Sequence, residues 1–102
     1  MDKRRKPLTP EEQLVLRQEM EKLVESHPEW TLPEALKQIR VTLRLTQREM
    51  ARVGKVTTLT LQKIESGASN PTLDTVEGLL RPFGLRITIG RSPPSTARAT
   101  ER

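Results

Sequence analysis

The chain contains no cysteine and a single histidine, His27, among its 102 residues. The lack of thiolates excludes disulfide scaffolds, zinc fingers, iron–sulfur clusters and cysteine nucleophiles. The carboxylates do not cluster at the spacing of metal ligands, and no nucleophile, base and orienting group recur at a usable spacing. We therefore expect neither a metal nor a cofactor, and no enzymatic activity.

Aromatic residues and long apolar runs are also scarce. Trp30 and Phe83 are the only aromatics, which excludes a broad stacking platform for single-stranded nucleic acid. No apolar run approaches the roughly 20 residues that cross a bilayer, and the basic N-terminus leads into Pro7 and charged residues rather than an apolar signal region. We expect one small, soluble, cytoplasmic domain with an aliphatic core.

The net charge of +5 is unevenly distributed along the chain. Residues 1–6 and 91–102 are basic, residues 7–34 carry seven acidic and two basic side chains, and residues 35–90 carry nine basic and four acidic ones. This pattern is typical of a chain that binds a polyanion with one part and another partner with a second part. Ordinary solvated helix faces would produce the same segregation.

Capping patterns and apolar periodicity predict five helices. Thr9 to Glu12 and Thr31 to Glu34 both read as capping boxes with an early proline. The predicted helices cover residues 10–27, 32–44, 46–53, 57–66 and 73–81. The inward-facing residues are expected to be Leu16, Met20, Leu23, Val24, Ala35, Leu36, Ile39, Leu43, Met50, Val56, Leu61, Ile64, Leu73, Val76, Leu79 and Leu80.

The first of these helices is acidic, and its apolar stripe must be covered by this chain, by a second copy or by another protein. His27 ends the stripe, where a helix-terminal or packing role is expected. Trp30 is expected to anchor the following connection against the core.

After Gly84 the apolar period changes from that of a helix to that of a strand. Leu85, Ile87 and Ile89 alternate with polar residues, which predicts a half-buried strand over 85–90. A single strand leaves its ladder groups unpaired, so we expect the same strand of a second copy to pair with it. The predicted organisation is a flexible basic arm (1–8), an acidic helical extension (9–32), a helical domain (33–84), a dimerisation strand (85–90) and a disordered tail (91–102).

Two short predicted helices joined by Gly54–Val56 suggest a helix-turn-helix, whose first helix braces across the DNA backbone and whose second enters the major groove. Ala51 is small where the helices would cross. The outer face of the second helix carries hydrogen-bonding groups and a leucine that could contact a thymine methyl, as base edges require. These residues are Thr57, Thr58, Leu59, Gln62 and Lys63.

Residues 33–84 resemble the lambda-repressor-like helix-turn-helix domains of the Cro and xenobiotic-response-element type. The positions that agree in order and spacing are Leu45, Thr46, Gln47, Met50, Ala51, Val56, Thr57, Leu61, Ile64, Glu65, Gly67, Pro71 and Leu73. The resemblance implies an all-α bundle and a transcriptional repressor that binds duplex DNA, and hence an association with the nucleoid.

The resemblance also implies roles for single residues. Gln47 would bond a phosphate, and Glu65 would bond inside the fold. The predicted DNA-binding set is Arg44, Gln47, Thr57, Thr58, Leu59, Gln62, Lys63, Ser66 and Asn70. For Arg44 and Lys63 a solvated face is the alternative.

The turn departs from the family pattern, because Gly54 precedes Lys55 where an apolar residue usually precedes glycine. Either Lys55 adopts a positive φ at some cost, or the turn is one residue out of register.

A helical domain followed by a short shared strand resembles the DNA-binding antitoxins that partner a kinase-like toxin. We therefore expect a homodimer on a palindromic operator, with a toxin as the protein partner. No separate oligomerisation or cleavage domain is expected, which favours an antitoxin or autoregulator over a phage repressor. The alternative is a protein-interaction module whose acidic helix binds a basic partner while DNA binding is secondary.

Overall fold

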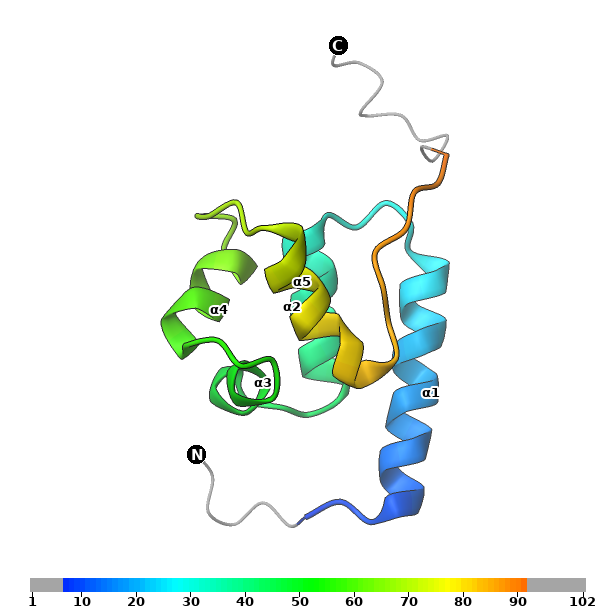
Figure 1. Ribbon diagram of the computed structural model, residues 1–102. Helices are drawn as coiled ribbons and strands as arrows, with labels where there is room; N and C mark the ends of the chain where they lie inside the picture. The colour runs from blue at the N-terminus through cyan, green and yellow to red at the C-terminus, as the bar shows by residue number, and fades with distance from the viewer. Residues whose placement is uncertain (1–6, 92–102) are drawn as a thin grey trace.

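Threonine precedes every α-helix in residues 7–91, the part of the chain that the computed structural model describes. The helices are α1 (Pro10–Ser26), α2 (Leu32–Thr42), α3 (Gln47–Val53), α4 (Thr58–Glu65) and α5 (Leu73–Leu80), followed by a 3-10 turn, η1 (Arg81–Phe83) (Figure 1). In each case the threonine hydroxyl accepts a backbone N–H three residues on, a cap that contributes about 1 kcal/mol. The five predicted helices are confirmed, with every end within two residues of the expected position.

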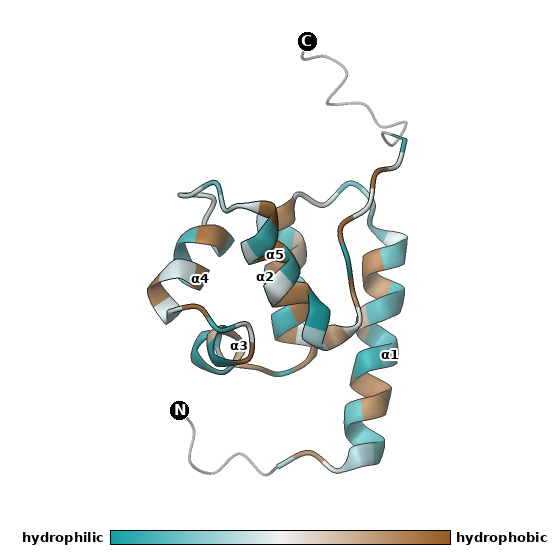
Figure 2. Cartoon of the chain, in the orientation of Figure 1, coloured by the Kyte–Doolittle hydropathy of each residue, from teal (hydrophilic) through white to brown (hydrophobic). Residues whose placement is uncertain are grey.

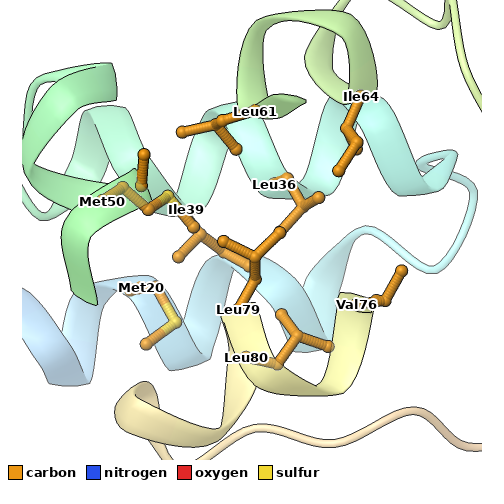
Figure 3. Close-up of a cluster of buried hydrophobic side chains, with 10 residues drawn as sticks. Met20, Leu36, Ile39, Met50, Leu61, Ile64, Val76, Leu79 and Leu80 are labelled. Atoms are coloured by element: carbon orange, nitrogen blue, oxygen red, sulfur yellow. The ribbon is translucent and has the colours of Figure 1, made fainter. Parts of the chain in front are cut away.

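The core lies among all five helices, with α2 packed against both α1 and α4. Leu36 of α2 is fully buried (Figure 3). The remaining core side chains surround it and are Met20, Ile39, Met50, Ala51, Leu61, Ile64, Val76, Leu79 and Leu80. The core is aliphatic, as the composition predicted.

Helix α1 lies at the edge of the bundle, where hydrophobic and hydrophilic bands alternate along it (Figures 1 and 2). Leu16 and Met20 are buried, and Val24 packs against the core. The Arg17 Nη2 donates to the Pro82 carbonyl oxygen at 2.9 Å, which ties α1 to η1. This chain therefore covers the stripe itself, and α1 is part of the folded domain.

Two expectations about packing were wrong. Leu73 is 69% exposed rather than inward, because it is the first residue of α5 and a helical side chain packs over the turn that precedes it. Trp30 does not join the core cluster. Its ring stacks on His27, with the ring centroids 4.2 Å apart, and closes the α1–α2 connection.

His27 also has an electrostatic partner at the end of α1. Its Nδ1 lies 2.8 Å from Oε2 of Glu29. The hydrogen bond with His27, helped by one from the backbone, lowers the pKa of the Glu29 carboxyl. This helix-terminal role agrees with the expectation for His27.

The strand expected over residues 85–90 does not form within residues 7–91. The Leu85 N–H donates to the Leu80 carbonyl at 3.2 Å, and the Leu85 side chain packs against the core of its own domain. Ile87 is 36% exposed and Ile89 is 96% exposed. A strand is defined by hydrogen bonds to a neighbouring strand, and the described chain supplies no such neighbour. Most of the predicted arm (1–8) and tail (91–102) lies outside the described residues.

Candidate nucleic-acid interface

Helices α3 and α4 pack against each other across the four residues from Gly54 to Thr57. Ala51 is 1% exposed where the two helices meet, and the Val56 N–H donates to its carbonyl at 3.0 Å. A small buried residue at the crossing allows the backbones to approach closely. The arrangement is that of the predicted helix-turn-helix (Figure 1).

The conformation of the turn decides between the two alternatives considered above, a positive φ at Lys55 and a turn one residue out of register. Lys55 has φ 60°, so the lysine takes the left-handed conformation. Gly54 has φ −84° and is required for space, since a Cβ there would overlap the Leu79 side chain and lie 3.3 Å from its Cα. The close approach of α5 thus explains the glycine at residue 54, and the positive φ of the turn falls on the lysine that follows it.

The outer face of α4 presents Leu59, Gln62 and Lys63 to solvent. Leu59 is 58% exposed, although it is a large apolar side chain. The spacing of three and four residues places these side chains on one face. Thr57 serves as the N-cap, since its hydroxyl accepts the Thr60 N–H at 3.0 Å.

A chain of side-chain hydrogen bonds connects this face to the interior. The Gln62 Nε2 donates to Oε1 of Gln47 at 3.3 Å, and the Gln47 Nε2 donates to Oε1 of Glu65 at 3.1 Å. Glu65 in turn accepts from Arg40, from Nε at 2.8 Å and from Nη2 at 3.1 Å. Arg40 also donates through Nη1 to the Leu45 carbonyl at 3.1 Å. The network joins α2, α3 and α4 and restricts how α4 can move.

Burial makes the inner part of this network strong. The side chains of Glu65 and Arg40 are 5% and 15% exposed, so water competes little for their hydrogen bonds. The internal role implied for Glu65 agrees with this geometry. Sequence analysis gave no role to Arg40, because its partner lies 25 residues away and no local pattern connects them.

A shallow polar hollow lies beside the network and brings some of the predicted site residues together. Gln47, Gln62 and Ser66 line it, with Arg40, Glu65, Thr46 and Lys37. Lys37 was not among the predicted site residues. Asn70 is exposed in the loop before α5.

Arg44 lies apart from this group. It has φ 61° in the α2–α3 connection and lines a hollow with α1 residues that include Glu11 and Glu19. Within residues 7–91, no three His, Asp or Glu side chains gather to hold a metal ion. No helix in that part of the chain is long and apolar enough to cross a membrane.

A protein-family model described as helix-turn-helix matches residues 36–89, which is more than half of the chain. The match contains α3, the turn and α4 together with the α2 and α5 residues that pack on them. No curated protein and no solved structure matched the sequence.

Proposed function

Because the chain belongs to this helix-turn-helix family of DNA-binding transcriptional regulators, we propose that it is a sequence-specific repressor that inserts α4 into the major groove of a palindromic operator. The observation that carries the proposal is the hydrogen-bonded chain from Gln62 through Gln47 to Glu65. Base recognition requires side chains held in a defined position before the DNA arrives. This network orients the Gln62 amide at the surface of α4.

The proposed contacts divide into base and backbone contacts. Gln62 and Lys63 would bond purine edges, and Leu59 would contact a thymine methyl. Thr57 and Thr58 lie at the start of α4. In helix-turn-helix complexes with DNA, the N-terminal end of the recognition helix contacts the base edges. Gln47, Ser66 and Asn70 would bond phosphates, which positions the domain but does not select a sequence. We leave Arg44 out of the proposed interface because it lies beside α1.

The test begins with selection of a preferred duplex from a random pool. Gln62→Ala should then lower the affinity for that duplex by about 5- to 150-fold, which corresponds to roughly 1–3 kcal/mol. Its affinity for random-sequence duplex should change little, because Gln62 contributes no charge. Gln18→Ala, at an exposed position on α1, is the matched control. If both variants bind the selected duplex as the parent does, Gln62 does not read bases.

We propose that the operator is bound by a homodimer. The support is the exposure of Ile87 and Ile89 after η1, where their backbone N–H and C=O groups have no ladder partner among the described residues. The same segment of a second copy would cover these side chains and pair the backbone, with Leu85 already packed on its own domain. A twofold dimer presents two recognition helices about 34 Å apart, one duplex turn.

The dimer is tested with Ile89→Asp, whose position is too exposed for the change to disturb the monomer fold. Analytical ultracentrifugation should find monomers, and the affinity for the selected palindrome should fall because the two half-sites are no longer linked. Thr88→Asp adds the same charge at the neighbouring residue and should leave the dimer intact. A dimer of Ile89→Asp with parental affinity would place the dimer contact elsewhere.

One surface on α1 favours a second function, in which the protein binds a toxin and acts as its antitoxin. Leu14 and Val15 are 56% and 51% exposed on this acidic helix. Leu14 borders a partly open, mainly apolar hollow of about 480 Å³ that also involves Phe83 and Pro82. Acidic residues around exposed apolar ones suit a basic protein partner.

The product of the neighbouring reading frame is the partner to test. Co-purification should be lost in the double variant Leu14→Gln/Val15→Gln, while DNA binding is retained. Val41→Gln on α2, at 51% exposure, is the matched control and should keep the partner. Deletion of residues 1–28 would be uninformative, because Met20 belongs to the core. If the neighbouring product does not bind the parent protein, the antitoxin hypothesis is wrong.

A further inference from the structure

Three cations lie in a row along the outer face of α3 and the turn that follows it. Arg48 and Arg52 are four residues apart, which places them on one side of α3, and Lys55 follows in the turn beyond the helix end at Val53. All three are exposed, and among residues 7–91 none of their side chains makes a hydrogen bond or an ion pair. The acidic residue nearest in sequence, Glu49, uses its carboxylate to accept the Thr46 N–H at 2.9 Å. The row therefore presents positive charge that the fold itself does not use.

The backbone conformation of Lys55 is a second indication that this positive charge has a function. Its φ of 60° is a conformation that glycine adopts without strain. A glycine at this position would fold more easily than the lysine, so folding does not explain the residue. Non-glycine residues held in strained conformations concentrate at active sites, ligand clamps and switch regions, which makes Lys55 a candidate for a binding role.

We propose that Arg48, Arg52 and Lys55 form a phosphate track, which contacts the DNA backbone at the edge of the groove that α4 enters. The proposal rests on the DNA binding proposed above. It adds a set of contacts that lies outside the outer face of α4. Arg48 follows Gln47, whose side chain bonds Gln62 of α4, and Lys55 stands two residues before Thr57, the N-cap of α4. In sequence, the track therefore begins one residue after Gln47 and ends two residues before the N-cap of α4.

The row is matched to a phosphodiester strand by its charge, since each phosphate of the strand carries one negative charge. An acidic protein partner is less well matched, because protein interfaces place apolar side chains at their centre. No apolar residue stands at the three positions of this row.

Neutralising the track should change the salt dependence of DNA binding. Each lost phosphate contact makes the slope of log K against log salt shallower by about 0.9, so three contacts account for about 2.7. The ratio of the parent's affinity to the triple variant's affinity should then be about 500 times larger at 0.1 M salt than at 1 M. Base reading by Gln62 is unaffected, so the preferred sequence should stay the same.

The experiment compares Arg48→Gln/Arg52→Gln/Lys55→Gln with a control of equal charge, Lys22→Gln/Arg81→Gln/Arg91→Gln, whose positions are also exposed. Fluorescence anisotropy measures affinity for the selected duplex from about 0.05 to 0.4 M salt. A shallower slope in the track variant alone supports the proposal. Equal slopes in the two variants overturn it, because net charge would then account for the effect. A parent protein that binds no duplex instead refutes the proposed repressor.

Lys55→Gly separates a binding role from a purely structural one. Removal of the strained side chain should raise the melting temperature of the protein. The same change should make the slope of log K against log salt shallower by about 0.9. Below the salt concentration at which parent and variant bind equally, each tenfold reduction of salt should then weaken the variant about eightfold relative to the parent. A variant that is more stable and keeps the parental slope would remove Lys55 from the track.

Discussion

The ion pair between Arg40 and Glu65 should be the most sensitive polar contact of this domain. Arg40→Met removes two donors to the Glu65 carboxylate and one to the Leu45 carbonyl. The carboxylate, with its side chain 5% exposed, then keeps the Gln47 amide as its one remaining donor among residues 7–91. A buried charge that loses its partner costs about 3–5 kcal/mol. That loss is a large part of the 5–15 kcal/mol that stabilise a typical domain.

Removal of both charges should be far less damaging. In Arg40→Met/Glu65→Met no charge remains buried without a partner, and two methionines fill similar volume with flexible side chains. The stability of the double variant should return to within about 2 kcal/mol of the parent. Its DNA specificity should still fall, because Gln47 no longer has the carboxylate that orients it.

Urea denaturation of the parent, the two single variants and the double variant measures this coupling. The midpoint should move while the slope m stays constant, since the fold is retained. The double-variant cycle should give a coupling energy well above 0.5 kcal/mol. Losses that simply add in the double variant would refute the argument that the two charges depend on each other.

Three further predictions concern packing and protonation. Gly54→Ala should lower stability by about 1–3 kcal/mol, because the new methyl overlaps Leu79; an unchanged thermal midpoint would contradict the packing. Met20→Ala should cost about 2–5 kcal/mol by urea denaturation, since the side chain is fully buried, and a loss under 0.5 kcal/mol would mean that α1 is not part of the core. The hydrogen bond with His27 lowers the pKa of Glu29 below its ordinary 4.5. The contribution of this hydrogen bond to the free energy of unfolding is therefore complete at a pH above the unfolded-state pKa of Glu29, and it disappears as the pH falls through the folded-state pKa. Carboxyl NMR titration should find this pKa rising toward 4.5 in His27→Ala, and an unchanged pKa would exclude the contact.

The helices and their limits were predictable because their signals are local. A threonine hydroxyl caps a backbone N–H three residues away, and α1, α2 and α3 each add a glutamate that completes a capping box. The apolar period that follows each cap identifies most of the buried face. The family resemblance placed the helix-turn-helix and implied that Glu65 turns inward, and the geometry agrees on both.

The predicted strand shows the limit of such local signals. The alternation of Leu85, Ile87 and Ile89 with polar residues indicates that successive side chains face different environments. Strand structure also requires a neighbouring strand, which the local pattern cannot supply. Leu85 is covered by its own core instead. Whether Ile87 and Ile89 meet a second copy stays a prediction.

The sequence by itself thus determined the order of helices, their caps, the helix-turn-helix and its exposed residues, because these depend on contacts within about four positions along the chain. Only the tertiary structure decided how that unit is held. Arg40 and Glu65 are 25 residues apart, and Gly54 meets Leu79 of α5 across the same separation. Both contacts exist because α2, α3, α4 and α5 pack at particular angles, and those angles depend on how all the core side chains fit together at once.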